Sequence, residues 1–439
     1  MEDKKTVKTV YVPMAADFIH PGHINILKIA AELGEVTVGL FTDKAIASYK
    51  RVPYMNYEQR ENVVSSIRYV SNIIPQETKD YEPNLRKLKP DYMVHGTDWL
   101  AGPLKAVRDK AITIMAEWGG QIIEPEYTKN VSSTDIHKFN KSFVTMPEQR
   151  LAAFKNLLRM KECIRVMEAH NGLSAIVVEN TQIVSDGQGI RAFDALWLSS
   201  LTDSTAKGKP DIEFVDLTSR MATVNDILEV TNKPIIYDGD TGSVTEHFVL
   251  TVKRLERLGV SAVIIEDKTG LKQNSLIETD RKIHIQADIN DFCDKIKRGK
   301  QAQSTSDFMI FARIESLIAG AGMQDALKRA KAYLDAGADG IMIHSRQNDG
   351  KDILEFCNEY NKFENRRYLI VVPTNYPILT EEELQKAGVN IIIYANQLLR
   401  SAYTAMKNTA EEILKNHRAY ESDEKYIKAI DLVKLIKEN

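Results

Sequence analysis

The sequence predicts an α/β protein in two parts, a Rossmann-like domain followed by a (β/α)8 barrel of the TIM type. First, the chain has 439 residues, which is long for a single hydrophobic core. Second, short apolar runs alternate with amphipathic segments of helical periodicity. Third, eight of these runs follow residue 150, and eight strands close such a barrel. We expect domains at residues 1–135 and 151–439, joined by a polar linker at residues 136–150.

Composition excludes several classes of partner. The chain has 58 basic and 61 acidic residues and a net charge of -3, so nucleic acid is not an expected partner. No apolar run reaches the roughly 20 residues of a membrane helix, and the N-terminus lacks the apolar core of a signal peptide. The cysteines Cys163, Cys293 and Cys357 are far apart and odd in number, which indicates reduced structural thiols. We expect a cytoplasmic protein that acts on small molecules, with no membrane partner.

The first domain shows the alternation of a small parallel sheet. We expect strands at residues 10–14, 36–41, 92–95 and 121–124, and helices at residues 24–33 and 57–70. The first strand is followed by His20-Pro21-Gly22-His23, which places two imidazoles at the entry to a helix. Such imidazoles can donate to a phosphate, and the amides and dipole of the helix act on the same anion. A metal pair or a plain helix start are the alternatives, although no third metal ligand lies nearby in the sequence.

Asp17 and the HPGH motif resemble the HxGH nucleotidyltransferases, especially the cytidylyltransferases that use CTP to activate glycerol phosphate, phosphocholine or phosphoethanolamine. The resemblance continues at residues 57–60 (YEQR), 96–99 (GTDW) and 132–134 (SST). It implies that CTP is a co-substrate, that His20 and His23 are catalytic, and that Lys44 or Lys50 faces the triphosphate. The nucleotide-binding residues that it implies are Asp17, Lys44, Arg60, Asp98, Ser132, Ser133 and Thr134.

The segment that leads to residues 132–134 departs from the family pattern, because Tyr127 stands where the family has an arginine. Lys129 could supply the charge, but a lysine does not reproduce the bidentate fork of a guanidinium. The alternative to a transferase is therefore a nucleotide-binding or docking module without turnover.

The eight apolar runs of the second part predict the barrel strands in order. They lie at residues 175–178, 195–198, 234–237, 262–265, 309–312, 340–343, 368–372 and 390–394, and a helix is expected from residue 150 to residue 166. Amphipathic stretches such as residues 246–258, 323–334 and 381–387 separate several of them. The span from the first strand to the end, about 265 residues, fits the typical size of roughly 250.

The segment EDKTGLKQNS, residues 266–275, begins where a buried strand ends. Ligand sites of such barrels form at the carboxyl ends of the strands, where several other strands also carry polar residues. Asp238, Asp240 and Glu266 are oxygen ligands suited to Mg²⁺, while Arg313, His344, Lys272 and Asn274 supply positive charge and donors. These residues predict a Mg²⁺-dependent enzyme that acts on a small phosphorylated or carboxylated anion.

Residues 168–175, 238–240, 266–275, 312–315 and 342–345, together with the stretch around Trp197, resemble phosphoenolpyruvate phosphomutase of the isocitrate lyase superfamily. Lyases of that superfamily carry a cysteine motif of the type KKCGH, whereas this chain has Lys272-Gln273-Asn274-Ser275 and no cysteine there. Phosphonopyruvate hydrolases are closer relatives that differ at the position of Asn274, so this residue favours the mutase over the hydrolase alternative.

The resemblance implies a role for each residue at the barrel mouth. Mg²⁺ would be held directly by Asp238 and through water by Asp240 and Glu266. Asp211 would be a phosphoryl acceptor or an orienting residue, and Lys272 with Asn274 would belong to a loop that closes over the substrate. The implied catalytic residues are Asp211, Lys272, Asn274, Arg313 and His344, and the substrate-binding residues are Trp197, Ser199, Ser200, Leu201 and Ser275. Ser200 replaces a family glycine, which is acceptable only if the backbone there does not need a positive φ.

Fusions of these two kinds of domain occur in phosphonate biosynthesis, and this chain resembles one. The barrel would convert phosphoenolpyruvate to phosphonopyruvate, a separate decarboxylase would act next, and the first domain would transfer CMP to a phosphonate such as 2-aminoethylphosphonate or 2-hydroxyethylphosphonate. Members of the superfamily tend to exchange C-terminal helices, so we expect a homo-oligomer. Residues 398–413 could take part in this exchange, and packing of these residues within their own chain is equally compatible with the pattern.

Overall fold

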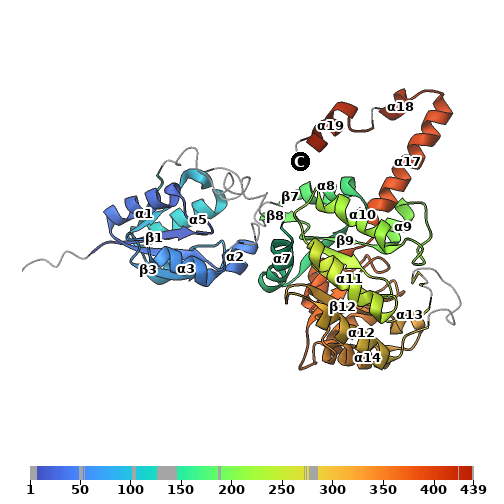
Figure 1. The fold of residues 1–439 in the computed structure, drawn as a ribbon. Coiled ribbons are helices and arrows are strands. Elements are labelled where there is room, and N and C mark those ends of the chain that lie inside the picture. Colours follow the sequence, from blue (N-terminus) through green and yellow to red (C-terminus); the bar gives the residue numbers. More distant parts are fainter. Residues whose placement is uncertain are drawn as a thin grey trace, which may run out of the picture. The chain divides into compact units, whose positions relative to one another are not determined.

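The computed structural model describes residues 7–48, 53, 55–100, 105–125, 146–185, 189–270, 272, 274, 275, 285–423 and 425–437. The chain forms two compact units, Met1–Ser142 with Gln182–Arg191, and Phe143–Thr181 with Ala192–Asn439 (Figure 1). Among the described helices, none is long and apolar enough to cross a membrane.

The first unit contains a five-stranded parallel sheet in the order β3-β2-β1-β4-β5, as expected for a Rossmann-like domain. Its strands are β1 (Thr9–Met14), β2 (Glu35–Phe41), β3 (Asn72–Gln76), β4 (Tyr92–Val94) and β5 (Gln121–Ile123). Its helices are α1 (Pro21–Leu33), α2 (Asp43–Ala47), α3 (Tyr57–Ser65), α4 (Glu82–Leu88) and α5 (Lys105–Ala116), with a 3-10 turn η1 (Thr97–Trp99). The strand β3 was not predicted, because it is partly exposed and contains Pro75, which is a poor strand residue.

The helix α1 covers the sheet next to the HPGH motif. His20 is its N-cap residue and Pro21 occupies the first turn, where the missing N–H costs nothing. Leu27 and Ala30 are buried against the sheet. A Cβ atom added at Gly39 of β2 would lie 2.0 Å from the Tyr11 hydroxyl. Only glycine at this position therefore leaves room for the Tyr11 side chain.

The second unit is a closed barrel of eight parallel strands, in the order β10-β11-β12-β13-β14-β15-β6-β9. The strands are β6 (Ile164–Glu168), β9 (Ala195–Leu198), β10 (Ile235–Asp238), β11 (Ala262–Glu266), β12 (Met309–Ile314), β13 (Gly340–Ile343), β14 (Tyr368–Val371) and β15 (Ile391–Tyr394). A separate two-stranded sheet joins β7 (Gln182–Ser185) and β8 (Gly189–Ala192), and Gln182–Arg191 belongs to the first unit. The predicted strand number and parallel arrangement are therefore confirmed.

The helices of this unit precede or connect the strands, and most of them lie along the outside of the barrel (Figure 1). They are α7 (Pro147–Met160), α8 (Gly172–Asn180), α9 (Ser200–Ala206), α10 (Leu217–Leu228), α11 (Thr245–Leu258), α12 (Ile289–Ala302), α13 (Ser316–Ala319), α14 (Met323–Asp335), α15 (Lys351–Tyr360) and α16 (Glu381–Lys386). The chain continues with α17 (Gln397–Asn416), α18 (Tyr420–Asp423) and α19 (Ala429–Lys437).

The predicted first barrel strand, residues 175–178, is wrong, because these residues lie in α8. The first strand is β6, which falls in the stretch predicted as helix. Asn171 and Ser174 form a capping box that starts α8. The helix buries Ala175 and Val178 and exposes Val177. A short apolar run does not by itself distinguish a strand from a buried helix.

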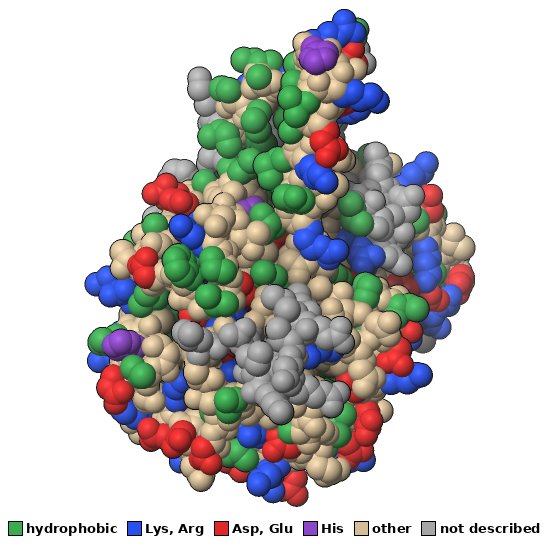
Figure 2. Space-filling model, turned by 90° about the vertical axis from the view of Figure 1, so that its right-hand side faces the viewer, with side chains coloured by type: hydrophobic (Ala, Val, Ile, Leu, Met, Phe, Trp, Pro, Cys, Tyr) green, Lys and Arg blue, Asp and Glu red, His purple; other side chains and the backbone are tan. Residues whose placement is uncertain are grey.

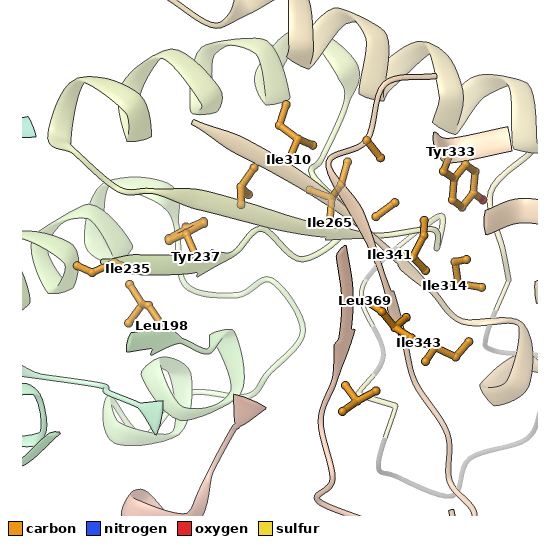
Figure 3. Packing of buried hydrophobic residues seen from close by; sticks show 14 of the residues in the cluster. Leu198, Ile235, Tyr237, Ile265, Ile310, Ile314, Tyr333, Ile341, Ile343 and Leu369 are labelled. Atoms are coloured by element: carbon orange, nitrogen blue, oxygen red, sulfur yellow. The ribbon is translucent and has the colours of Figure 1, made fainter. Parts of the chain in front are cut away.

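The barrel strands alternate between two buried layers, as a pleated strand requires. One layer fills the barrel interior with residues such as Val166, Ile264 and Phe311, joined by Phe154 of α7. The other layer packs between the strands and the surrounding helices, and Figure 3 shows part of it, including Leu198 and Ile341. This packing fixes the carboxyl ends of the strands, where the polar residues begin.

Candidate functional site

One pocket of the barrel gathers the residues predicted from the ends of different strands. Its lining contains all the predicted catalytic and substrate-binding residues of the barrel and one predicted metal ligand, namely Trp197, Ser199, Ser200, Leu201, Asp211, Asp238, Lys272, Asn274, Ser275, Arg313 and His344. The apolar side chains Met342 and Val372 also line it. The other two predicted metal ligands, Asp240 and Glu266, lie next to this pocket through the contacts described below.

The three predicted metal ligands are linked through their backbones. The Asp240 amide donates to Asp238 Oδ1 at 3.2 Å, and the Glu266 amide donates to the Asp240 carbonyl at 2.8 Å. The second oxygen of Asp238 accepts from the amide and the hydroxyl of Ser200 at 3.0 and 2.7 Å. Ser200 does not have a positive φ, so the serine is compatible with the local backbone. Ser200 is one of the predicted substrate-binding residues, and its amide is bonded to the Asp238 carboxylate in this structure.

The Lys272 ammonium lies among these acidic groups. Its Nζ atom donates to Asp211 Oδ1 at 2.9 Å and also contacts Asp240 and the Ser200 hydroxyl. Burial alone would raise the pKa of Asp238, but the charges of Lys272, Arg220 and Arg313 lower it to about 2. Burial would likewise lower the pKa of Lys272, and the neighbouring carboxylates raise it above its ordinary value instead. Lys272 is therefore a charged lysine that neutralises buried aspartates.

Asn274 and Lys272 both contact Asp211, which lies on the segment before α10. The Asn274 amide nitrogen donates to Asp211 Oδ2 at 2.6 Å, so each oxygen of Asp211 has a partner from the segment around residues 272–274. Glu213, two residues later, has a φ of +57° and accepts from the amide and hydroxyl of Thr241 at 3.0 and 2.7 Å. These contacts join the segment of Asp211 to the loop that follows β10.

Arg313 and His344 form a second charged group at the ends of β12 and β13. Arg313 Nε donates to Glu315 at 2.6 Å, and its Nη2 donates to Ser275 Oγ at 2.8 Å and to His344 Nδ1 at 2.9 Å. A guanidinium only donates, so the contact with Arg313 assigns His344 Nδ1 as an acceptor, with Glu315 Oε1 3.4 Å from the same nitrogen. Burial and the Arg313 charge lower the pKa of His344, in agreement with a neutral imidazole. Ser275, predicted to bind substrate, instead bridges Arg313 and Glu315 here.

The donor set suits a hard divalent cation, since its predicted ligands are carboxylates. Both oxygens of Glu266 are buried and accept no hydrogen bond from the described residues, while the cations of Lys268 and Arg313 lie 3.4 and 3.3 Å away. Among the described residues, no three acidic, histidine or cysteine side chains already surround a common point. The Lys272 ammonium contacts Asp240 Oδ1 in this structure.

Sequence reasoning missed Arg220, which lies on α10 rather than at a strand end. Its guanidinium donates to Asp240 Oδ2 at 2.9 Å and lies 4.2 Å from the centre of the Tyr237 ring. The available signal was an arginine on the apolar face of a helix, beside Met221, Val224 and Ile227, all buried. Such a residue needs a buried anion, because an unpaired charge is costly in a protein interior.

In the first unit, the two histidines of the HPGH motif lie together at the start of α1, with ring centres 3.9 Å apart. Burial lowers the pKa of His20, which favours a neutral imidazole. Asp17 accepts from the Met55 amide at 3.1 Å, and Lys44 lies on the short helix α2. The predicted imidazole pair is therefore brought together at a helix N-terminus.

Arg60 has a different environment from the predicted phosphate contact. Its side chain is fully buried and donates to the carbonyls of Met55, Ala15 and Phe41 and to Asp43 at 2.5 to 3.1 Å. In this arrangement the guanidinium ties loops of the first unit together, and its contact with phosphate stays a prediction. The side chain of Asp98 and the residues Lys50, Tyr127, Ser132, Ser133 and Thr134 lie outside the described part of the structure.

Comparison with known families separates the chain into the same two parts. The sequence model of phosphoenolpyruvate phosphomutase matches residues 154–414, and that of cytidylyltransferase-like proteins matches residues 15–139. A phosphoenolpyruvate phosphomutase of Tetrahymena pyriformis is 36% identical over 288 residues, which is 65% of this chain and 91% of that protein. A phosphonopyruvate hydrolase of Variovorax sp. (strain Pal2) is 34% identical over 261 residues, which is 58% of this chain and 84% of that protein.

Solved structures give the same picture for the barrel. The crystal structure of a phosphoenolpyruvate phosphomutase from Streptomyces platensis subsp. rosaceus is similar with a TM-score of 0.60 at 31% identity, covering 66% of this chain and 95% of that chain. A phosphonopyruvate hydrolase in complex with oxalate and Mg²⁺ is similar with a TM-score of 0.58 at 30% identity, with coverages of 66% and 95%. Mutase and hydrolase are thus similar to the chain to nearly the same degree.

Proposed function

Because the chain belongs to the phosphoenolpyruvate phosphomutase family at residues 154–414 and joins it to a cytidylyltransferase-like domain at residues 15–139, we propose that the barrel interconverts phosphoenolpyruvate and phosphonopyruvate. In this reaction the bond between phosphorus and the enol oxygen breaks, and its electron pair stays on the oxygen. Carbon three of the enolate then bonds to phosphorus. No water or other reactant is consumed.

The residues of the pocket suit such a transfer, which depends on positioning and charge complementarity more than on covalent chemistry. Arg313 and His344 lie side by side, and His344 carries its proton on the nitrogen that does not accept from Arg313. Both can therefore donate to phosphoryl oxygens, with the Asn274 amide as a third donor. A Mg²⁺ ion held by Asp238, Asp240 and Glu266 would, when bound, lower the basicity of the enolate.

Exclusion of water separates a mutase from a hydrolase, because a loose phosphoryl transition state reacts readily with water. Trp197, Leu201 and Met342 give the pocket apolar walls. The contacts of Lys272 and Asn274 with Asp211 hold these two side chains in the pocket lining. They support a role for Asp211 in orienting these two residues.

The position of Asn274 is the observation that carries the mutase proposal over a lyase or a hydrolase. Asn274 lies in the pocket where related lyases have the cysteine motif and where the hydrolases differ. All three cysteines of the chain belong to the described residues, and none of them lines this pocket.

Two coupled assays distinguish mutase from hydrolase when phosphonopyruvate and Mg²⁺ are supplied. Lactate dehydrogenase with NADH reports pyruvate, the product of hydrolysis. Addition of pyruvate kinase and ADP makes the same signal report phosphoenolpyruvate. We expect NADH oxidation only when pyruvate kinase and ADP are present. Equal rates without pyruvate kinase would support the hydrolase alternative, and no signal in either assay would contradict both activities.

For the first domain we propose CMP transfer from CTP to a phosphonate, such as 2-aminoethylphosphonate or 2-hydroxyethylphosphonate. The adjacent imidazoles of His20 and His23 at the N-terminus of α1 support this proposal, because they can donate to the phosphate at which charge develops. The test is pyrophosphate release from CTP and each phosphonate, compared with a variant in which both histidines are alanine. CTP binding without pyrophosphate release from any phosphonate would favour the non-catalytic module.

We also propose that the protein is a homo-oligomer that uses α17. None of the 20 residues of this helix is buried, and Tyr403, Met406 and Leu414 are 61 to 75% exposed. Figure 2 shows hydrophobic side chains gathered on the C-terminal segment. Light scattering after size exclusion should give a multiple of the 49.6 kDa chain mass. Met406→Glu should lower the mass while Lys407→Glu should not, and a monomer at every concentration would contradict the proposal.

A further inference from the structure

We infer that Arg220 is a positioning residue for the metal site, which fixes one oxygen of Asp240 so that the other faces the pocket. This inference rests on the proposed function, because it assumes that Asp240 takes part in holding a divalent cation. It adds a residue from outside the barrel mouth to the site.

The two oxygens of Asp240 face different neighbours. Oδ2 accepts from Arg220 Nη1 at 2.9 Å, while Oδ1 contacts the Lys272 ammonium. Arg220 comes from α10, which is a regular helix packed into the outer hydrophobic layer. Lys272 comes from the segment whose residues 271, 273 and 276–284 lie outside the described part. One oxygen is thus bound to a residue of a regular helix, and the other contacts Lys272, which lines the pocket.

Arg220 is itself held from several directions. Its side chain is 6% exposed, and the guanidinium lies over the Tyr237 ring. Its Nε atom is 3.6 Å from Asp203 Oδ2. Asp203 accepts in turn from the Thr223 hydroxyl at 2.8 Å and contacts Lys207. Among the described residues, the Nε and Nη2 atoms of Arg220 have no hydrogen-bond partner. Packing on Tyr237 and the charge of Asp203 confine the guanidinium, and its hydrogen bond goes to Asp240, which makes it a reference for that carboxylate.

Asp240 needs such a reference because its own backbone is unusual. Its φ of +52° lies in the left-handed region, which is sparsely populated by residues other than glycine and clusters at functional sites. Its amide and carbonyl are bonded to Asp238 and to the Glu266 amide. The direction of the Asp240 side chain therefore decides whether the three carboxylates face the same point, and Arg220 sets that direction.

A purely structural ion pair would make a different prediction from a positioning residue. If Arg220 only neutralised buried charge, its loss would lower stability but leave metal affinity unchanged. If Arg220 positions Asp240, its loss weakens metal binding. Lysine at this position keeps the positive charge but lacks the planar guanidinium, so it should restore metal binding only in part. Removal of a residue that hydrogen-bonds a metal ligand typically weakens metal affinity by about 10- to 100-fold.

The test is Mn²⁺ binding to the full chain, measured as free Mn²⁺ by electron paramagnetic resonance without substrate. The variants are Arg220→Met and Arg220→Lys, and the matched control is Arg298→Met, which removes an exposed arginine paired with Glu246. We expect the Mn²⁺ dissociation constant to rise about 10- to 100-fold for Arg220→Met, to rise less for Arg220→Lys, and to stay unchanged for Arg298→Met. Wild-type affinity in a folded Arg220→Met protein would overturn the inference.

If circular dichroism shows that Arg220→Met does not fold, Asp203→Asn replaces it, since this change loosens Arg220 without removing it. A severalfold weaker Mn²⁺ affinity supports the inference, and an unchanged affinity overturns it. Absence of Mn²⁺ binding in the wild type would overturn the metal site and the inference together. Mn²⁺ binding that depends on Arg220 in a protein without mutase activity would overturn only the proposed reaction.

Discussion

Replacement of Lys272 by methionine should lower the free energy of unfolding, because the buried carboxylates at the barrel mouth lose the ammonium that they share. The Lys272 side chain is 4% exposed, and its ammonium lies 2.9 Å from Asp211 and in contact with Asp240. It is also the leading charge that lowers the pKa of Asp238 to about 2. Methionine keeps most of the volume but leaves these buried carboxylates without their shared partner. Breaking a buried ion pair in this way costs about 3 to 5 kcal/mol.

The assay is urea-induced unfolding at pH 7 in EDTA, for the wild type, Lys272→Met, and Lys272→Met combined with Asp211→Asn. We expect the single variant to lose about 3 to 5 kcal/mol of unfolding free energy, and the double variant to recover part of it because one uncompensated charge is removed. When Mg²⁺ replaces EDTA in the same assay, the unfolding free energy of Lys272→Met should rise more than that of the wild type. A loss below about 1 kcal/mol, typical of an exposed pair, would refute the reasoning, as would a double variant less stable than Lys272→Met.

Three further predictions concern single groups of the same site. Asn274→Ala should leave the unfolding midpoint unchanged but lower mutase turnover by about 100-fold, because a donor to the moving phosphoryl group is lost; turnover near that of the wild type would remove Asn274 from the mechanism. The pKa of Asp238 is depressed from 3.8 to about 2, so its ionisation should contribute about 2 kcal/mol above pH 4 that disappears as the pH falls towards 2. Urea unfolding of the wild type and Asp238→Asn across this range checks the sign, and parallel curves would contradict it. Glu213→Ala should lower the free energy of unfolding by about 1 to 3 kcal/mol, because the Thr241 amide loses its acceptor, and it should also raise KM. Glu213→Gln should restore much of the stability and of the KM. An alanine variant with the stability and KM of the wild type would show that Glu213 does not support the loop after β10.

The fold was largely predictable because burial on both faces of a parallel strand leaves a recognisable apolar run. Seven of the barrel strands follow from this signal, with ends that differ from the structure by a residue or two. The exchange of β6 for α8 shows its limit, because the run at residues 175–178 is equally apolar and only the cap at Asn171 reveals the helix. The strand β3 was missed because Pro75 and the polar residues at its two ends interrupt the apolar run expected of a buried strand.

The candidate site was predictable wherever residues follow a strand, because the carboxyl ends of barrel strands meet at one mouth. Asp238, Arg313 and His344 lie at or just after strand ends and line one pocket, while their roles stay predictions. Arg220 and Glu213 could not be found in this way, since they reach the site from a helix and from a loop with a positive φ. Their contacts depend on tertiary packing that no periodicity in the sequence records.

The burial of Arg60 shows a related limit in the first unit. An arginine near an HxGH motif is expected to face phosphate, yet here its donors are used by three carbonyls and Asp43. The sequence predicts which residue types are near a site, but the partners of a long side chain are set by loops that fold around it.

The central claim is that the barrel moves a phosphoryl group between oxygen and carbon without water. The most direct test incubates the protein with phosphonopyruvate and Mg²⁺ in water enriched in ¹⁸O and follows the phosphorus signals by NMR. We predict a growing phosphoenolpyruvate signal in which ¹⁸O is confined to the bridging enol oxygen, because the carbonyl oxygen of phosphonopyruvate exchanges with water, and no ¹⁸O-labelled inorganic phosphate as the first product. Inorganic phosphate that carries ¹⁸O as the first product would contradict the claim and identify a hydrolase.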